Sequence, residues 1–248
     1  MLKRSTRPLL LLLGLLGLWQ LLVWLSGVPV YILPSPWMVA RSIVTNIDLL
    51  AAHSAITIVE ILLGLALGTL LGVLCALILQ LSVGLRDWIL PLLIASQAIP
   101  VFALAPLLML WLGYGMSAKI VMSLLIIFFP IATATYDGLR RTPPSHLALA
   151  HTLGATRLQQ LLFIRIPAAL PAFASGMRIA AAIAPIGAVI GEWVGGSQGL
   201  GYLMLYANAR MNTDLMFAAL AVLTTCTLIL YFTTDRLLSR WIFWSSTP

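Results

Sequence analysis

The side chains that could do chemistry in this chain are few, and they form no catalytic pattern. The 248 residues include seven acids, three histidines and two cysteines. There is no GxxxxGKS or GxxxxGKT loop to hold nucleotide phosphates, no HExxH zinc motif and no GxSxG nucleophile turn. Cys75 and Cys226 lie in apolar stretches, without CxxC or Cys/His spacing. We therefore expect no catalytic residue, no metal and no cofactor. If ATP drives this protein, another subunit must hydrolyse it.

Polar side chains gather instead in one segment, residues 137–171. It contains four arginines and two of the three histidines: Arg140, Arg141, Arg157, Arg165, His146 and His151. A basic, helix-capable segment between apolar runs is expected in water on the cytoplasmic side of a membrane.

This segment predicts two short helices joined by one glycine. Ser145 is placed to cap a helix over 146–153, after a Thr-Pro-Pro sequence that ends the preceding helix. Gly154 then turns the chain, and 156–163 has the length of a second short helix. Two prolines redirect the chain into the next apolar run: Pro167 and Pro171.

The composition of the whole chain is that of an integral membrane protein. Hydrophobic residues make up 61% and charged residues 8%, whereas soluble domains carry about 25% charged residues. The net charge of +7 does not indicate nucleic-acid binding, because the arginines are scattered at the ends of apolar runs rather than clustered on one face.

The apolar runs predict an all-α fold with six transmembrane helices in one domain. The domain is residues 1–248, with a core over 50–236. The expected spans are residues 9–25, 51–81, 88–112, 119–136, 172–194 and 215–234. A cleaved signal peptide is the competing interpretation of the first run, which is long for that role and lacks an A-x-A site. A short interfacial helix capped by Ser35 is expected after it.

The basic residues predict the orientation of these spans. Three lie at outer ends: Arg41, Lys119 and Arg210. Eleven lie at inner ends: Lys3, Arg4, Arg7, Arg86, Arg140, Arg141, Arg157, Arg165, Arg178, Arg236 and Arg240. The positive-inside rule therefore places both termini and residues 137–171 in the cytoplasm.

Glycines and prolines mark two spans in particular. Gly64, Gly68 and Gly72 form a small-residue stripe that lets helices approach closely, either within the protomer or between two copies. Pro91, Pro100 and Pro106 interrupt the third span, and they indicate either a helix bent around a pathway or ordinary kinked packing: both interpretations are open.

Residues 137–171 resemble the EAA loop of the inner-membrane permeases of bacterial ABC importers. That pattern is Glu-Ala-Ala, three residues, Gly, nine residues and Ile-x-Leu-Pro. Here Ala148-Leu149-Ala150 takes the first position, Gly154 follows after three residues, and Ile164-Arg165-Ile166-Pro167 follows after nine more. The chain departs from the pattern at Ala148, where the family has an acid, and at Ile166, which replaces leucine.

The resemblance implies a homodimer of this permease in the inner membrane, two ATP-binding subunits beneath it and a periplasmic substrate-binding protein above it. The loop would dock on the ATPase and transmit its movement, so that the spans alternate between inward-open and outward-open states. The expected coupling residues are His146, Ala148, Leu149, Ala150, His151, Gly154, Ala155, Arg157, Ile164 and Pro167.

The resemblance also implies a translocation path lined by the third, fourth and fifth spans. Candidate pathway or gate residues are Gln97, Pro100, Met109, Ser123, Pro185 and Glu192. For each of them, ordinary packing is the competing interpretation. Glu192, an acid at the outer end of a span broken by proline, could instead pair with Arg210 and hold the outer loop.

Further similarity points to the branch that carries nitrate, sulfonates and taurine. It lies in Leu33-Pro34-Ser35-Pro36, in residues 98–113 and in residues 191–202. The segment 206–211 is similar to permeases assigned to pyrimidine precursors of thiamine. The expected cargo is thus a small polar solute of one of these classes. The competing function is a secondary carrier or channel without an ATPase, against which the scarcity of charges within the spans argues.

Overall fold

The structure, a computed structural model, describes residues 7–244, and every regular element in that range is helical. Lys3 and Arg4, counted above as inner charges, lie outside the described residues. The longer helices are α1 (Arg7–Ser26), α3 (Ile47–Leu81), α4 (Val83–Ala98), α5 (Val101–Leu112), α6 (Met116–Arg140), α9 (Ile166–Gly195) and α11 (Thr213–Trp241). The shorter ones are α2 (Pro36–Thr45), α7 (Pro144–Thr152), α8 (Arg157–Gln160), the π-helical turn Leu161–Arg165 and α10 (Leu200–Ala209).

Four helices in the described range are long and apolar enough to cross a membrane. They are Ile47–Leu81, Met116–Arg140, Arg157–Gly195 and Thr213–Trp241. The pair Gly84–Ala98 and Val101–Leu112 counts as a fifth span if the two are taken together, and Leu10–Ser26 in α1 is a shorter apolar helix. All six expected spans are therefore largely helical, and the span number of six stays a prediction.

The third expected span is two helices rather than one. α4 and α5 meet at 99°, and the break falls at Ile99 and Pro100, where the backbone is extended. Proline holds the residue before it away from helical geometry. Pro91 and Pro106 lie inside α4 and α5 without ending either helix.

The core of the molecule is the packing of α6 between α3 and α9. The glycine stripe of α3 faces α6: a Cβ at Gly68 would lie 2.8 Å from Cγ2 of Ile127, and one at Gly72 would lie 3.0 Å from Cγ2 of Ile131. The third member, Gly64, faces Ser123 in the same way. The stripe therefore brings together helices of one protomer, which was the first of its two interpretations.

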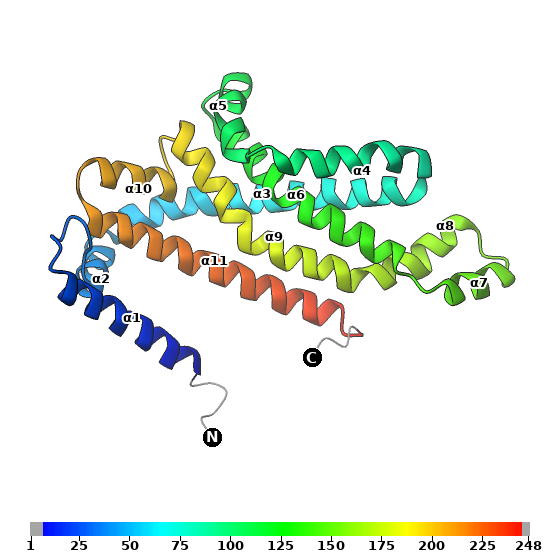
Figure 1. Cartoon of the computed structure of the whole chain (residues 1–248), viewed down its shortest axis with the longest axis horizontal. Coiled ribbons are helices and arrows are strands. Elements are labelled where there is room, and N and C mark those ends of the chain that lie inside the picture. Colours follow the sequence, from blue (N-terminus) through cyan, green and yellow to red (C-terminus); the bar gives the residue numbers. More distant parts are fainter. Residues whose placement is uncertain (1–6, 245–248) are drawn as a thin grey trace.

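The two ends of the molecule carry different short elements (Figure 1). α2 and α10 lie at one end, and α7 and α8 lie at the opposite end, beyond the turn between α3 and α4. As expected, α2 begins at Pro36 and is capped by Ser35, whose Oγ accepts a hydrogen bond from Met38 N. α11 runs from the α2 end toward the α7 end.

Candidate functional site

Helix α7 is a short, exposed helix at one end of the molecule, inside the segment that resembles the EAA loop. It begins at Pro144, and proline at the first helical position needs no N–H partner. The expectation that Ser145 caps it was wrong: Pro143 holds the N-cap position, and Ser145 is already inside the helix. The Thr-Pro-Pro sequence thus both ends α6 and starts α7.

Gly154 ends α7 in the way that the sequence predicted. Its φ is +78°, in the left-handed region that glycine tolerates. Gly154 N donates to His151 O at 2.9 Å, and Ala155 N donates to Ala150 O at 2.9 Å. These two bonds form a Schellman motif, which fixes the direction in which the chain leaves the helix.

Helix α7 and the turn after it, up to Arg157, form a protrusion. Its surface is apolar as well as basic. The side chains of Leu149 and Leu153 are 62% and 77% exposed, and Ala150 between them is 6% exposed. His146, Ala148, His151 and Arg157 are also exposed. Exposed leucines on a short fixed helix favour a protein partner over a solvated connector.

The chain after Gly154 differs from the expected second short helix. Thr156 and Gln159 form a capping box that starts α8. The helix then continues without interruption through the π-helical turn into α9, so that Arg157–Gly195 forms one helix of 39 residues. Pro167 and Pro171 do not redirect it. Ile164 and Pro167 therefore lie on this long helix, partly buried, while the other coupling candidates lie on or beside the protrusion.

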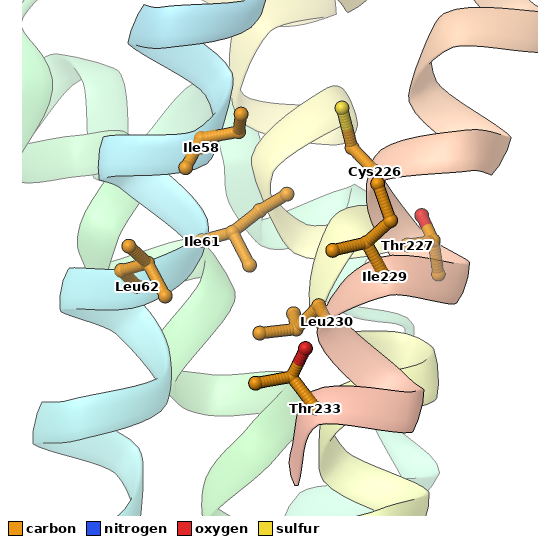
Figure 2. Close-up of a pocket in the computed structure, with 8 residues that line it drawn as sticks. All are labelled: Ile58, Ile61, Leu62, Cys226, Thr227, Ile229, Leu230 and Thr233. Atoms are coloured by element: carbon orange, nitrogen blue, oxygen red, sulfur yellow. The ribbon is translucent and has the colours of Figure 1, made fainter.

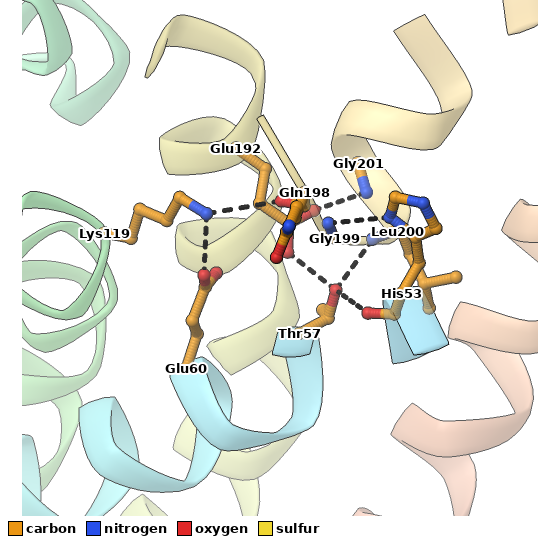
Figure 3. A network of polar contacts seen from close by, with 9 residues as sticks. All are labelled: His53, Thr57, Glu60, Lys119, Glu192, Gln198, Gly199, Leu200 and Gly201. Atoms are coloured by element: carbon orange, nitrogen blue, oxygen red, sulfur yellow. Dashed lines mark hydrogen bonds and ion pairs between the residues drawn. The ribbon is translucent and has the colours of Figure 1, made fainter. Parts of the chain in front are cut away.

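A buried polar network ties α3, α6 and the α9–α10 segment together, at the end opposite to α7 (Figure 3). Lys119 Nζ donates to Glu60 Oε1 at 2.8 Å and to Gln198 O at 3.3 Å. Both charged side chains are buried, with 6% of Lys119 and none of Glu60 exposed. This pair was not predicted from the sequence. The acid Glu60 inside the apolar run 51–81 could have indicated it, because a buried acid needs a partner.

The second half of the network centres on Glu192 and Thr57. Glu192 Oε1 accepts a hydrogen bond from Thr57 Oγ1 at 2.6 Å, and its other oxygen accepts from Gly201 N. Leu200 N donates to Thr57 Oγ1 at 2.8 Å. The alternative in which Glu192 pairs with Arg210 was wrong, because Arg210 lies over a tyrosine ring of α10 instead.

A histidine of α3 completes this anchoring. Gly199 N donates to Nδ1 of His53 at 2.9 Å. The ring of His53 also stacks on Tyr202 of α10, with 6.1 Å between centroids. The start of α10 is therefore held by the buried Thr57 and the partly buried His53 of α3, and by Glu192 of α9.

The six pathway candidates do not line one common cavity in the described range. Gln97 lies on a cavity of about 250 Å³ beside the α4–α5 break, and Pro100 is exposed at the break. The other four are buried among helices: Met109, Ser123, Pro185 and Glu192. Their roles in a path stay predictions.

The cavity between α3 and α11 has a different character (Figure 2). It measures about 260 Å³ and is lined by apolar side chains such as Ile58, Ile61 and Leu230, with the thiol side chain of Cys226 at one edge. Thr227 and Thr233 add two hydroxyls, but five of the eight lining residues are isoleucine or leucine, which offer a polar solute no hydrogen-bond partner. The cavity does not offer a route for the cargo classes considered above.

Comparison with known proteins agrees with this architecture. Residues 68–242 match the family described as "Binding-protein-dependent transport system inner membrane component". A probable ABC transporter permease protein of Haemophilus influenzae is 56% identical over 98% of both chains. The formylaminopyrimidine transport permease of Halalkalibacterium halodurans is 37% identical, over 89% of this chain and 88% of its own length. The riboflavin transport system permease of Chloroflexus aurantiacus is 40% identical, with 92% and 87% covered.

The fold is also that of a solved transporter. The structure superposes with a TM-score of 0.70 on a chain of the inward-facing methionine ABC transporter MetNI, at 20% identity and covering 80% of this chain and 98% of that one. The matched family spans most of the chain, from the second half of α3 to the end of α11, and it includes the protrusion at α7. The chain therefore belongs to the multi-pass inner-membrane permeases of binding-protein-dependent ABC transporters.

Proposed function

We propose that this permease subunit forms, with a second copy, the translocation path of an ATP-driven importer for a small polar solute. Residues 146–167 couple it to a separate ATPase, of which two copies bind the dimer. A periplasmic binding protein delivers the solute at the α2 and α10 end. In this arrangement both termini are cytoplasmic and the protomer has six spans.

The observation that carries the coupling role is the geometry of α7. A helix that transmits movement must present a contact surface and must not bend under load. The exposed leucines of α7 supply the surface, and the Schellman motif at Gly154 fixes the helix end. The segment 138–171 carries four arginines and no acid, so the partner groove is expected to be apolar and acidic.

The names of the relatives narrow the cargo. Two of the similar permeases are described as carrying formylaminopyrimidine and riboflavin, which are planar nitrogen heterocycles. We propose a solute of this chemical class, with a sulfonate such as taurine as the second candidate. Uptake assays with both classes, in membranes that contain the ATPase and binding protein, decide between them.

The coupling proposal is tested by replacing Gly154 with valine. Nothing lies within 4 Å of a Cβ at this position, but the φ of +78° is unfavourable for a branched side chain, at a cost of about 1–3 kcal/mol. We expect Gly154→Val to leave membrane insertion intact and to reduce uptake by about tenfold or more, in line with that energy. ATP hydrolysis by the associated subunit should no longer follow substrate.

The matched control is Gly84→Val, which also lies in open space but has no positive φ. It should transport normally. Normal uptake by Gly154→Val would contradict the coupling role of α7. Failure of a nucleotide-binding subunit to copurify with the wild-type permease would instead favour a carrier that acts alone.

A further inference from the structure

A small polar cavity lies beside the buried ion pair of Glu60 and Lys119. It measures about 170 Å³, and its lining includes both charged side chains together with Tyr114, Met116, Ser197 and Gln198. Sites for drug-sized ligands measure about 300 Å³ or more, so this cavity suits one ring or one small functional group. It lies between α3, α6 and the start of the α9–α10 segment.

Both charged groups keep unused hydrogen-bonding capacity. Glu60 Oε1 accepts from Lys119, but Glu60 Oε2 is buried and has no hydrogen-bond partner among the described residues. The ammonium of Lys119 has three donors, and the described contacts use two of them, on Glu60 and on Gln198 O. The ion pair beside the cavity therefore has an acceptor and a donor without hydrogen-bond partners, on adjacent side chains.

The neighbouring acid, Glu192, is a carboxylate with a purely structural role and serves as a comparison for Glu60. Glu192 lies close enough to Glu60 for their charges to interact, and it is equally buried. Both of its oxygens accept hydrogen bonds, from Thr57 Oγ1 and Gly201 N. Glu192 is thus saturated by the protein, whereas Glu60 is not.

Stability does not explain the unsaturated pair. Burying two opposite charges costs several kcal/mol per ion, and their attraction offsets this only when the remaining hydrogen bonds are also made. A buried polar atom without a partner adds about 1–3 kcal/mol. Ionisable side chains inside membrane segments typically mark a substrate or ion pathway.

We infer that this cavity is a contact site for the transported solute. Lys119 and Glu60 bind one hydrogen-bond acceptor and one adjacent hydrogen-bond donor of that solute. Lys119 donates to the acceptor, and Glu60 Oε2 accepts from an adjacent N–H. An aminopyrimidine edge, with a ring nitrogen beside an amino group, has this pattern, and so does an amide edge. A sulfonate without an amino group, such as methanesulfonate, carries acceptors only, and the Glu60 carboxylate repels it. The inference rests on the proposed importer function and selects its heterocyclic substrates.

The test measures binding to the full-length permease in lipid nanodiscs, without ATPase or binding protein. Saturation-transfer NMR is recorded with 4-amino-2-methylpyrimidine, with 2,4-dimethylpyrimidine and with methanesulfonate. We expect a saturable signal for the aminopyrimidine. The dimethyl compound, which lacks the N–H donor, should bind about tenfold more weakly, because a hydrogen bond to a charged group is worth about 1.5–3 kcal/mol. Methanesulfonate, which has no N–H donor, should give no signal.

The paired variant Glu60→Gln with Lys119→Met removes both charges and should lose the aminopyrimidine signal. The control is Arg178→Met with Asp235→Asn, which removes the ion pair between α9 and α11, where Arg178 Nε lies 2.6 Å from Asp235 Oδ1. This control should bind normally. Thermal unfolding in the same nanodiscs shows that each variant is folded. The comparison of the three ligands uses the wild-type protein and therefore does not depend on any variant.

Four outcomes overturn the inference. The first three are equal binding of the two pyrimidines, binding of methanesulfonate at equal strength, and an unchanged aminopyrimidine signal in the Glu60/Lys119 variant, which would mean binding at assay concentration only. Absence of any signal with the wild type also rejects the site. None of these results bears on copurification of the ATPase, so the importer function would stand while the contact site fell.

Discussion

At the scale of single residues, the buried carboxylate of Glu192 explains why positions 199 and 201 are glycines. Gly199 has φ +113°, and a Cβ there would overlap the carboxylate of Glu192. A Cβ at Gly201 would lie 2.8 Å from Glu192 Oε2. The backbone of this turn can therefore approach the acid only because these positions lack side chains.

We expect Gly199→Ala to destabilise the permease. The added Cβ both meets the carboxylate and forces a strained φ, which alone costs about 1–3 kcal/mol. The change should lower the midpoint of thermal unfolding in detergent. Gly14→Ala is the control, since nothing lies within 4 Å of a Cβ at Gly14. An unfolding midpoint equal to that of the wild type would show that Glu192 does not anchor this turn.

Single residues also mark the limits of sequence reasoning for the site. The turn at Gly154 was predictable, because glycine at the end of a short helix has a local, backbone cause. The cap of α7 was assigned to the wrong residue, since Pro144 and Ser145 both suit a helix start. The pair of Glu60 and Lys119 joins residues 59 positions apart, and such a contact depends on how helices pack.

At the scale of helices, the contact between α3 and α6 depends on the glycine stripe. We expect Gly68→Val to separate the two helices, because even a Cβ there would lie 2.8 Å from Ile127. Overpacking of this kind costs about 1–3 kcal/mol. The yield of monodisperse protein after detergent extraction should fall.

Gly17→Val, in the open surface of α1, is the matched control for that change and should extract like the wild type. If Gly68→Val also gave monodisperse protein with an unaltered unfolding midpoint, the close approach of α3 and α6 would not be required for the fold.

Helix existence was predicted better than helix ends. Apolar runs predicted the positions of α3, α6, α9 and α11, because length and hydropathy are local properties. The third span was expected as one bent helix, whereas Ile99 and Pro100 separate α4 from α5 at 99°. Proline permits either a kink or a break, and contacts with the neighbouring helices decide between them.

At the scale of the whole molecule, the proposed orientation places the α7 end in the cytoplasm and the α10 end outside it. A reagent that cannot cross the membrane should therefore reach only the α10 end in intact cells. In a cysteine-free background, Ser145→Cys on α7 should react with a membrane-impermeant maleimide only after the cells are permeabilised. Asn208→Cys on α10 should react in intact cells. Both residues are exposed in the structure. When the permease is expressed without its ATPase and binding protein, access of the reagent is therefore limited by the membrane alone.

Replacement of the free thiols Cys75 and Cys226 by serine supplies the unlabelled control. Labelling of Ser145→Cys in intact cells would reverse the proposed orientation, and with it the cytoplasmic location of both termini. The basic residues can predict the orientation from sequence alone, because it depends on the excess of Lys and Arg in the cytoplasmic loops and not on a particular tertiary contact.

The π-helical turn at Leu161–Arg165 has a consequence for the spacing of the loop motif. Each residue of an α-helix advances its direction by about 100° around the axis, and a π turn accommodates one extra residue within an unbroken helix. The nine residues between Gly154 and Ile164 contain most of this turn. The number of these residues therefore sets the direction, around the helix axis, in which α8 faces relative to the membrane-spanning part of α9. Removing one residue would rotate the protrusion by about a quarter turn, so that its leucines would point away from their present direction.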